Sequence, residues 1–391
     1  MKGKAMTALN PRQIAIQQAT KDFVAKHIIP RAAEYDKSGK FHSYLLDAAK
    51  PSKIFAMAVP KEFGGLGYDA LTQALVLEEW GYGCAGMGTT LAASVLSMES
   101  ILIAGNADQK RRFFAPMLSG GIGAFGLTEP SAGSDVGAGK TTAIKSGNGY
   151  VINGSKCWIT NGGMASVYVI FALTDASNGT KGISAFIVER DSPGLTMGDE
   201  EEKLGIRSSN TVYFELKNLH VPLENLLGKE GDGMKIAMKT LDMARPGIAA
   251  LAVGLAQRSL DECVKYLHAR FPHKPYPGQA LQFMLADMQM DITAARQVLH
   301  HTMALRDARA PFTEESATSK ALCTDVAMRV SARAVRLAGS YGYTSELSKF
   351  MRDAKVMQIY EGTNQIQRLV ISRAVFAPAP KVVPHLLAGV A

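Results

Sequence analysis

Apolar residues in the first third of the chain recur every three or four positions, which is the period of an α-helix. One such run extends from Ile14 to Ile29, and Pro30 is placed to bend or end the helix that it predicts. Further helices are predicted over residues 71–80, 89–102 and 107–118. Residues 1–120 are therefore expected to form an N-terminal α-helical domain.

From residue 122 to about residue 221 the pattern changes to an alternation with a period of two. β-branched and aromatic residues fill runs that are bounded by Gly, Asn, Asp and Pro, at 167–171, 183–188 and 211–216. These runs predict a middle β domain over residues 121–232, folded as a small barrel or sandwich.

The helical period returns after Gly233. Long helices are predicted over residues 235–269, 279–309, 313–338 and 345–357, with a shorter one after Glu361. Four long antiparallel helices suggest a bundle, so residues 233–391 are expected to form a C-terminal helical-bundle domain. The predicted fold class is α+β and multidomain, with helical, β and helical-bundle domains in that order.

Turn-forming and small residues gather between Leu127 and Asp135, in the sequence LTEPSAGSD. Backbone N–H groups and hydroxyls can approach an anion closely there, because little side chain intervenes. The overlapping sequence GSDVGAGKT resembles a phosphate-binding P-loop, but the first glycine that this motif requires falls on Ser134. We interpret residues 127–135 as a cradle for a pyrophosphate or a flat heterocycle, with an ordinary surface loop as the alternative.

Downstream, Asn153-Gly154 is the strongest type of signal for a hairpin turn, here between strands at 150–152 and 155–160. On the second strand Trp158 and Thr160 lie two residues apart and are expected to share one face. A large ring and a hydroxyl in that arrangement could cover a planar cofactor and hydrogen-bond to its edge. The alternative is a tryptophan that belongs to the core.

The composition is that of a globular protein with two or three domains, because the chain has 391 residues, 47% of them hydrophobic and 20% charged. The net charge of +8 is scattered, without a dense Lys/Arg block and interleaved aromatic residues, so no nucleic-acid partner is expected. A mild positive field suits a phosphate-rich small ligand instead.

The cysteines stand far apart, without a C-x-x-C pair, at Cys84, Cys157, Cys263 and Cys323. They are expected to be reduced thiols in a cytoplasmic protein. The adjacent His300 and His301 point to different faces of a helix, and no metal site is predicted. Neither a signal peptide nor a membrane-spanning segment is predicted.

Two motifs carry a family resemblance. The first is LTEPSAGSD at 127–135 followed by WITNG at 158–162, and the second is MRDAK at 351–355 running into QIYEGTNQIQ at 358–367. In this order they resemble the signature of the acyl-CoA dehydrogenases, over roughly residues 10–376 and nearest to the short-chain, butyryl-type members. The family's architecture of helices, then strands, then a helical bundle agrees with the elements predicted above.

The resemblance implies α,β-dehydrogenation of an acyl-CoA thioester to the trans-2-enoyl-CoA. It assigns the catalytic base to Glu361, and a carboxylate removes such a proton only when burial raises its pKa and hydrogen bonds polarise the thioester carbonyl. In the family those bonds come from the backbone N–H of this glutamate and from a ribityl hydroxyl of FAD. The alternative base position of some members is Ala244 here, which cannot accept a proton. The resemblance further places Asp242, Arg245, Gly362 and Ser134 at the substrate.

For FAD, the resemblance assigns Leu127 and Thr128 to the flavin ring, Ser134 to the phosphate or thioester neighbourhood, and Trp158 and Thr160 to the ring edge near N5. It assigns Thr363, Gln365, Arg270 and Gln279 to the adenosine and pyrophosphate side, in the family often across a subunit interface, which implies a homo-oligomer, a tetramer or a dimer. Two segments depart from the family pattern: the proline-rich loop at 270–279, and 336–342. We expect FAD to be retained but held more weakly at its adenosine end.

The leading hypothesis is an FAD-dependent acyl-CoA dehydrogenase that passes electrons to an electron-transfer flavoprotein. The alternatives are an enzyme for acyl groups tethered to a carrier protein, an oxidase-like enzyme whose flavin reacts with O₂, and a flavin-free scaffold. Glutaryl-specific members carry an arginine where this chain has Met87, so a dicarboxylyl substrate is not expected. The sequence leaves open the length and branching of the acyl chain.

Overall fold

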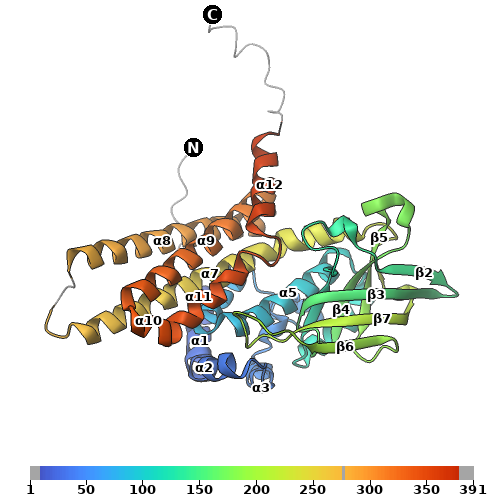
Figure 1. The fold of residues 1–391 in the computed structure, drawn as a ribbon. Coiled ribbons are helices and arrows are strands. Elements are labelled where there is room, and N and C mark those ends of the chain that lie inside the picture. The colour runs from blue at the N-terminus through green and yellow to red at the C-terminus, as the bar shows by residue number, and fades with distance from the viewer. Residues whose placement is uncertain (1–8, 275–277, 378–391) are drawn as a thin grey trace, which may run out of the picture.

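The computed structural model describes residues 9–274 and 278–377, in which helices precede and follow a group of strands (Figure 1). The N-terminal helices are α1 (Pro11–Phe23), α2 (Ile29–Ser38), α3 (Tyr44–Ala49), α4 (Ala70–Gly83), α5 (Ala85–Ala104) and α6 (Ala107–Leu118). Side-chain caps fix several helix starts. Asn10 and Asn106 each form a capping box with a glutamine three residues later, and the Asp69 side chain accepts from Thr72 N at 2.7 Å.

Pro30 bends the first helix rather than ending it. One π-helical turn over Val24–Ile28 joins α1 to α2, and Pro30 lies in the first turn of α2, where a missing N–H is tolerated. The chain therefore stays helical as far as Ser38.

Helix α5 bears on the expectation that no segment spans a membrane, because it has the length and hydropathy of a span. It is the one helix in the described ranges that does, by length and composition only. However, 83% of its most apolar 18-residue window is buried inside the protein, as in the core helix of a globular domain.

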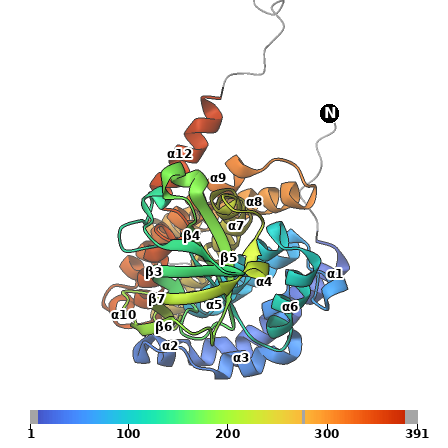
Figure 2. The ribbon, with the colours of Figure 1, turned by 90° about the vertical axis from the view of Figure 1, so that its right-hand side faces the viewer.

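The middle region is one eight-stranded sheet in the order β6-β7-β3-β2-β4-β5-β8, with β1 paired to β4 in parallel. The strands are β1 (Gly123–Gly126), β2 (Thr142–Ser146), β3 (Gly149–Thr160), β4 (Val167–Leu173), β5 (Ile183–Glu189), β6 (Leu195–Glu200), β7 (Thr211–Pro222) and β8 (Leu226–Leu227). Figure 2 shows β3, β7 and β6 side by side across the end of the molecule. All three strands predicted from period-two runs are present as β4, β5 and β7, and β1, β2, β6 and β8 are additional to the predicted strands.

Alternate residues of β4 and β5 belong to two different cores. Val167, Val169 and Phe171 face the helices, whereas Tyr168 and Ile170 face a separate core that the sheet itself encloses. Because both faces of β4 and β5 are buried, their sequences are nearly continuous apolar runs.

The hairpin prediction at Asn153-Gly154 is wrong. β3 runs without interruption from Gly149 to Thr160, and the hairpin turn lies at residues 147–148, where Ser146 of β2 pairs with Gly149 of β3. Gly154 instead pairs with Leu216 directly after a bulge between β3 and β7, with a φ of 148°, and a Cβ there would lie 2.5 Å from Thr141 Oγ1. The Asn153 side chain fixes this bulge by accepting from Asn218 N at 2.8 Å. Residues 147–148 and residues 153–154 both suit a tight turn. The pairing of β3 with β2 places the turn at 147–148.

The C-terminal helices confirm the predicted bundle and add α10. They are α7 (Gly233–Arg270), α8 (Gln279–Asp307), α9 (Thr313–Ala338), α10 (Ser340–Thr344), α11 (Glu346–Met357) and α12 (Asn364–Val375). Helix α7 runs from the strands to the far end of the bundle, and α12 projects from the body (Figure 1).

The N-terminal and C-terminal helices share one hydrophobic core because α4 and α7 cross closely. A Cβ on Gly254 of α7 would lie 1.9 Å from Glu78 O, and one on Gly81 of α4 would lie 2.2 Å from Leu251 O. Secondary structure changes type between Leu118 and Gly123 and again between Leu227 and Gly233. The division into units at 1–120, 121–232 and 233–391 stays a prediction.

Candidate active site

Glu361 lies in the turn between α11 and α12, at the inner end of the projecting helix. Glu361 and Gly362 both adopt left-handed backbone conformations, with φ of 51° and 89°. A residue with a side chain rarely adopts a φ of 89°, so position 362 favours glycine, and a Cβ there would also lie 2.6 Å from the Nε2 atom of Gln367. The turn is closed by Asn364 N, which donates to Gln358 O at 2.9 Å.

The Glu361 carboxyl group is set up to accept a proton. Its Oε2 atom is buried and has no hydrogen-bond partner among the described residues. Burial raises the pKa of Glu361 to about 7, and the positive charges of Lys320 and Arg245 oppose that rise. A carboxyl group whose pKa lies near neutral pH is a candidate general base.

Arg245 is the second buried charge of this site. It is only 4% exposed, and its Nη1 donates to Asp242 Oδ1 at 2.7 Å. Asp242 is held in turn by Thr313, whose Oγ1 donates to Asp242 Oδ2 at 2.8 Å. Burial lowers the pKa of Arg245 against the opposing charges of Asp242 and Glu361, and its Nε atom lacks a partner in the described chain. An unpartnered donor and an unpartnered acceptor near each other suggest a site for a polar ligand group.

Two residues that the sequence reasoning missed support the Glu361 turn. Lys320 of α9 is fully buried, and its Nζ donates to Gly362 O at 2.7 Å and to Asn364 Oδ1 at 3.0 Å. Gln367 Nε2 also donates to Gly362 O, at 2.9 Å. The sequence does contain a sign that Lys320 is buried. At helical spacing it shares a face of α9 with small and apolar residues, and that face is buried: Ser316, Ala317, Cys323 and Thr324.

Residues 127–135 lie beside β3, so the two parts of the first motif, 127–135 and 158–162, are neighbours in the structure. Cys157 N of β3 donates to Thr128 O at 3.0 Å, and Lys156 Nζ donates to Leu127 O at 3.3 Å. Lys156 also forms a buried ion pair of 2.7 Å with Glu129. Leu127 and Thr128 are half-buried and Ser134 is exposed, so these backbone contacts rather than side-chain burial hold the loop.

Trp158 is 59% exposed, so it does not belong to the core. It sits at a second bulge of β3, between the paired residues Lys156 and Ile159, with φ of 58°. A tryptophan held in the left-handed region with its ring in the open is a strained and exposed arrangement, which marks a candidate contact for a ligand. Thr160, two residues on, is half-buried.

The tertiary structure joins the two motifs through α7. Leu127 and Phe125 pack against a small apolar cluster of Leu96, Leu241 and Ala244. Ala244 directly precedes Arg245, which interacts electrostatically with Glu361. The structure therefore brings Leu127, Asp242, Arg245, Glu361 and Gly362 to one region.

Four other predicted residues lie elsewhere or have other contacts. Thr363 caps α12, since Ile366 N donates to its Oγ1 at 3.2 Å, and Gln365 is exposed. Arg270 ends α7 and Gln279 begins α8. Of the loop between them, residues 275–277, including two of its prolines, lie outside the described residues.

The two segments that depart from the family pattern meet at one cavity of about 370 Å³. Arg270 lines it together with Tyr341, whose ring stacks on that of Tyr266 with 4.5 Å between ring centroids. This cavity is a candidate for the predicted adenosine side of the cofactor site.

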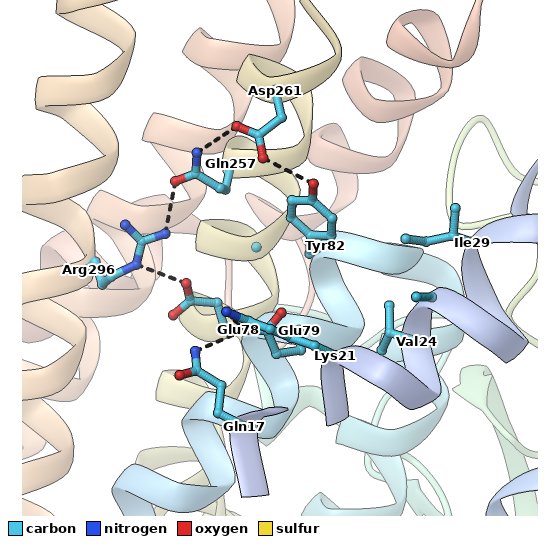
Figure 3. Close-up of a pocket in the computed structure, with 12 residues that line it drawn as sticks. Gln17, Lys21, Val24, Ile29, Glu78, Glu79, Tyr82, Gln257, Asp261 and Arg296 are labelled. Atoms are coloured by element: carbon cyan, nitrogen blue, oxygen red, sulfur yellow. Dashed lines mark hydrogen bonds and ion pairs between the residues drawn. The ribbon is translucent and has the colours of Figure 1, made fainter. Parts of the chain in front are cut away.

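A larger cavity of about 520 Å³ is lined by Lys21, Glu78, Glu79, Asp261 and Arg296, among others (Figure 3). Its charges pair with one another: Arg296 Nε contacts Glu78 Oε1 at 2.9 Å, and Tyr82 donates to Asp261 at 3.0 Å. None of the residues predicted from the motifs lines it, so we do not assign the reaction to it. No group of three or more His, Cys, Asp or Glu within residues 9–274 and 278–377 could hold a metal ion.

The fold and the site define a class of protein: a helix–sheet–helix molecule in which a buried carboxyl group of raised pKa and a turn-rich loop are brought to one region through α7. Family models identify the class more closely. The acyl-CoA dehydrogenase N-terminal domain matches residues 10–121, the middle domain 124–219 and the C-terminal domain 231–376. The chain therefore belongs to the acyl-CoA dehydrogenase family.

Individual relatives resemble the chain over almost its whole length. It is 42% identical to the short-chain specific acyl-CoA dehydrogenase of Clostridium acetobutylicum, over 94% of this chain and 99% of that protein. The solved butyryl-CoA dehydrogenase of Megasphaera elsdenii is 39% identical, with a TM-score of 0.90 over 94% of this chain and 99% of that one. A chain from a study of the electron transferring flavoprotein of Acidaminococcus fermentans is 42% identical, with a TM-score of 0.91 over 95% and 99%.

Proposed function

We propose that this protein is an FAD-dependent acyl-CoA dehydrogenase that converts a short-chain acyl-CoA to the trans-2-enoyl-CoA. The observation that carries the proposal is the buried Glu361 carboxyl group, whose pKa is raised to about 7 beside Arg245. In this reaction Glu361 takes the proton from the α carbon and the β carbon loses a hydride, so that a C=C bond forms. FAD, when bound, would supply the acceptor for this hydride, and an electron-transfer flavoprotein would take up the electrons.

Each residue of the site has a role in this proposal. Burial makes the Glu361 carboxylate a stronger base than it would be in water. Its backbone N–H donates to the thioester carbonyl and so acidifies the α proton, and Gly362 leaves room for the thioester. Arg245, anchored by Asp242, contacts the substrate and keeps a positive charge close to the base.

The residues of the β domain fit FAD. The Trp158 ring is exposed beside the loop that begins at Leu127 and Thr128, and a Cβ on Gly133 would meet nothing within 4 Å, so a ligand can approach the backbone of the loop. Leu127, Thr128, Trp158 and Thr160 would hold the flavin ring, and Ser134 the phosphate or thioester neighbourhood. When bound, FAD supplies the acceptor for the β-hydride.

An anaerobic titration tests the function. A panel of straight, branched and cyclic acyl-CoAs is added to the purified flavoprotein, and the oxidised flavin band is followed. Bleaching supports the proposal, and the best substrate defines the acyl chain. A bound flavin that no acyl-CoA bleaches would point to a carrier-tethered acyl group, rapid production of H₂O₂ in air would point to an oxidase, and a colourless protein would contradict the proposal.

The rate of flavin reduction is expected to rise with pH through about 7. The reaction needs the carboxylate form of Glu361, whose pKa burial raises to about 7, so the protonated and inactive form dominates below that pH. Single-turnover reduction measured across this range gives the midpoint. A midpoint near the ordinary pKa of a glutamic acid would contradict this assignment.

We further propose that the protein is a homo-oligomer in which Arg270 contacts the FAD of a second copy, with Gln279, Thr363 and Gln365 serving the same adenosine side. Arg270 lies about 25 residues beyond Arg245 along α7, or about 38 Å at the helical rise, so it is far from the substrate site that Arg245 lines in its own chain. Exposed apolar side chains on the projecting α12, Leu369 and Val375, and on Phe376 directly after it are available to pack against another subunit. A shared cofactor site is consistent with a symmetric dimer or tetramer.

An Arg270→Ala variant is expected to bind FAD about tenfold or more weakly, because it loses a charge-assisted hydrogen bond to the pyrophosphate. Flavin retention after dilution and the mass from sedimentation are measured together. Arg111→Ala, which removes an exposed arginine of α6, is the control and should leave both unchanged. A monomeric protein that keeps all of its FAD would contradict the shared site.

The location and the electron acceptor also belong to this proposal. All four cysteines are free and buried, which is consistent with a cytoplasmic protein. The similarity to a chain studied with an electron transferring flavoprotein supports such a protein as the acceptor.

A further inference from the structure

Lys320 is a charged side chain in a place where charges are rare. It lies in the middle of α9 with no exposed surface, next to the turn that carries Glu361. Burying an ammonium group is costly unless it is hydrogen-bonded and faces an opposite charge. Lys320 is therefore expected to have a specific structural or functional role.

The hydrogen bonds of Lys320 hold the Glu361–Gly362 turn from the side of α9. Its Nζ donates to Gly362 O at 2.7 Å and to Asn364 Oδ1 at 3.0 Å. Asn364 is itself fixed to α9, since its Nδ2 donates to Thr324 Oγ1 at 2.9 Å and to Asp325 Oδ1 at 2.8 Å. Two consecutive left-handed residues persist only when the surroundings hold them, and these bonds do so.

The charge of Lys320 acts on Glu361 as well. Burial lowers the pKa of Lys320 to about 7, while Glu361 and Asp325 raise it and Arg245 lowers it further. The charged and titratable groups that face Glu361 are thus Lys320 on α9, Arg245 with its partner Asp242 on α7, and Tyr360 in the same turn. Of the two cations, Arg245 already has a carboxylate at 2.7 Å, whereas no ion pair within 4.0 Å is found for Lys320 in the described chain.

We propose that Lys320 is a positioning residue: it holds the Glu361–Gly362 turn against α9 and, when protonated, places a positive charge near Glu361. The inference rests on the proposed function, because it concerns the base of that reaction. Lys320 does not touch the substrate, and it acts through Glu361.

Two variants separate the charge from the hydrogen bond. Lys320→Met keeps the length of the side chain but loses both, and Lys320→Gln loses the charge while keeping a donor. In both, the pH midpoint of flavin reduction should rise by up to about 1 unit, because the protonated Lys320 amine favours the carboxylate form of Glu361. The limiting rate at high pH should fall about tenfold or more in Lys320→Met and less in Lys320→Gln. Lys239→Met, an exposed lysine on α7, is the control.

A purely structural role would lower the thermal midpoint of the Lys320 variants and leave the pH midpoint unchanged, which would overturn the proposal. If neither variant folds, Gln367→Met tests the proposal instead. It removes the other hydrogen-bond donor to Gly362 O but leaves the charge of Lys320 in place. The proposal then requires a slower reaction with an unchanged pH midpoint, and a shifted midpoint would overturn it.

A second readout does not depend on turnover. The infrared carboxyl band that disappears in Glu361→Gln reports the protonation of Glu361 directly, and its midpoint should rise in Lys320→Met. If no acyl-CoA bleaches the wild-type flavin, the proposed function fails, and this band still tests Lys320. If wild type is bleached but the band midpoint stays unchanged in Lys320→Met, only the role of Lys320 fails.

Discussion

Replacing Glu361 by glutamine will slow the reduction of the bound flavin by acyl-CoA at least ~10²-fold. Glutamine has nearly the same shape, so the left-handed turn and the Lys320 contact to Gly362 O should remain. What it loses is the ability to accept the α proton. On the neighbouring α7 the alternative base position is Ala244, and the Asp242 carboxylate is paired with Arg245 at 2.7 Å.

The measurement is anaerobic stopped-flow reduction at saturating substrate, with the flavin content of each sample determined first. Glu34→Gln, which changes an exposed glutamate on α2, controls for the loss of one negative charge. A Glu361→Gln variant that binds FAD normally and is reduced within about twofold of the wild-type rate would show that another group removes the proton.

Replacing Lys156 by methionine will destabilise the β domain by about 3–5 kcal/mol, because it leaves a buried carboxylate without its cation. Lys156 is 1% exposed and Glu129 is 6% exposed, and their side chains meet at 2.7 Å. Glu129 would keep only the backbone donors of Lys140 and Thr141. The variant also loses the bond to Leu127 O, so the loop assigned to the flavin should loosen and FAD should be released more readily.

Urea unfolding and FAD retention measure this effect. Lys145→Met is the matched control, because that lysine is 66% exposed and lies 3.6 Å from Glu230, where an ion pair contributes at most ~1 kcal/mol. A double variant, Lys156→Met with Glu129→Gln, should recover part of the loss since no unpaired charge remains. A single variant no less stable than the control would show that water reaches Glu129.

The hairpin shows where local sequence was not enough. Residues 147–148 and Asn153-Gly154 are both suitable for a tight turn, and the sequence predicted the second. The pairing of β3 with β2 and β7 decided in favour of the first, and placed Gly154 inside β3, next to a bulge and against Thr141. A choice between two adequate turns depends on partners that are distant in the chain.

The site residues also differ in whether the sequence alone or only the folded structure identifies them. Glu361, Gly362, Leu127 and Trp158 stand in continuous motifs, so the sequence alone could name them. Lys320 belongs to no motif that we recognised, and only the path of α9 past the α11–α12 turn shows what it contacts. The contribution of Arg270 depends on a second copy and stays a prediction.

The sequence by itself determined the order of helices, strands and helices, because the periods of 3.6 and 2 are local properties of the chain. It also determined which glutamate stands in the motif of the base. The tertiary structure decided that this carboxyl group is buried, that Lys320 and Arg245 face it, and that Leu127 reaches the same region through α7. Burial and opposing charge shift a pKa, and both come from residues that only the folded chain brings together.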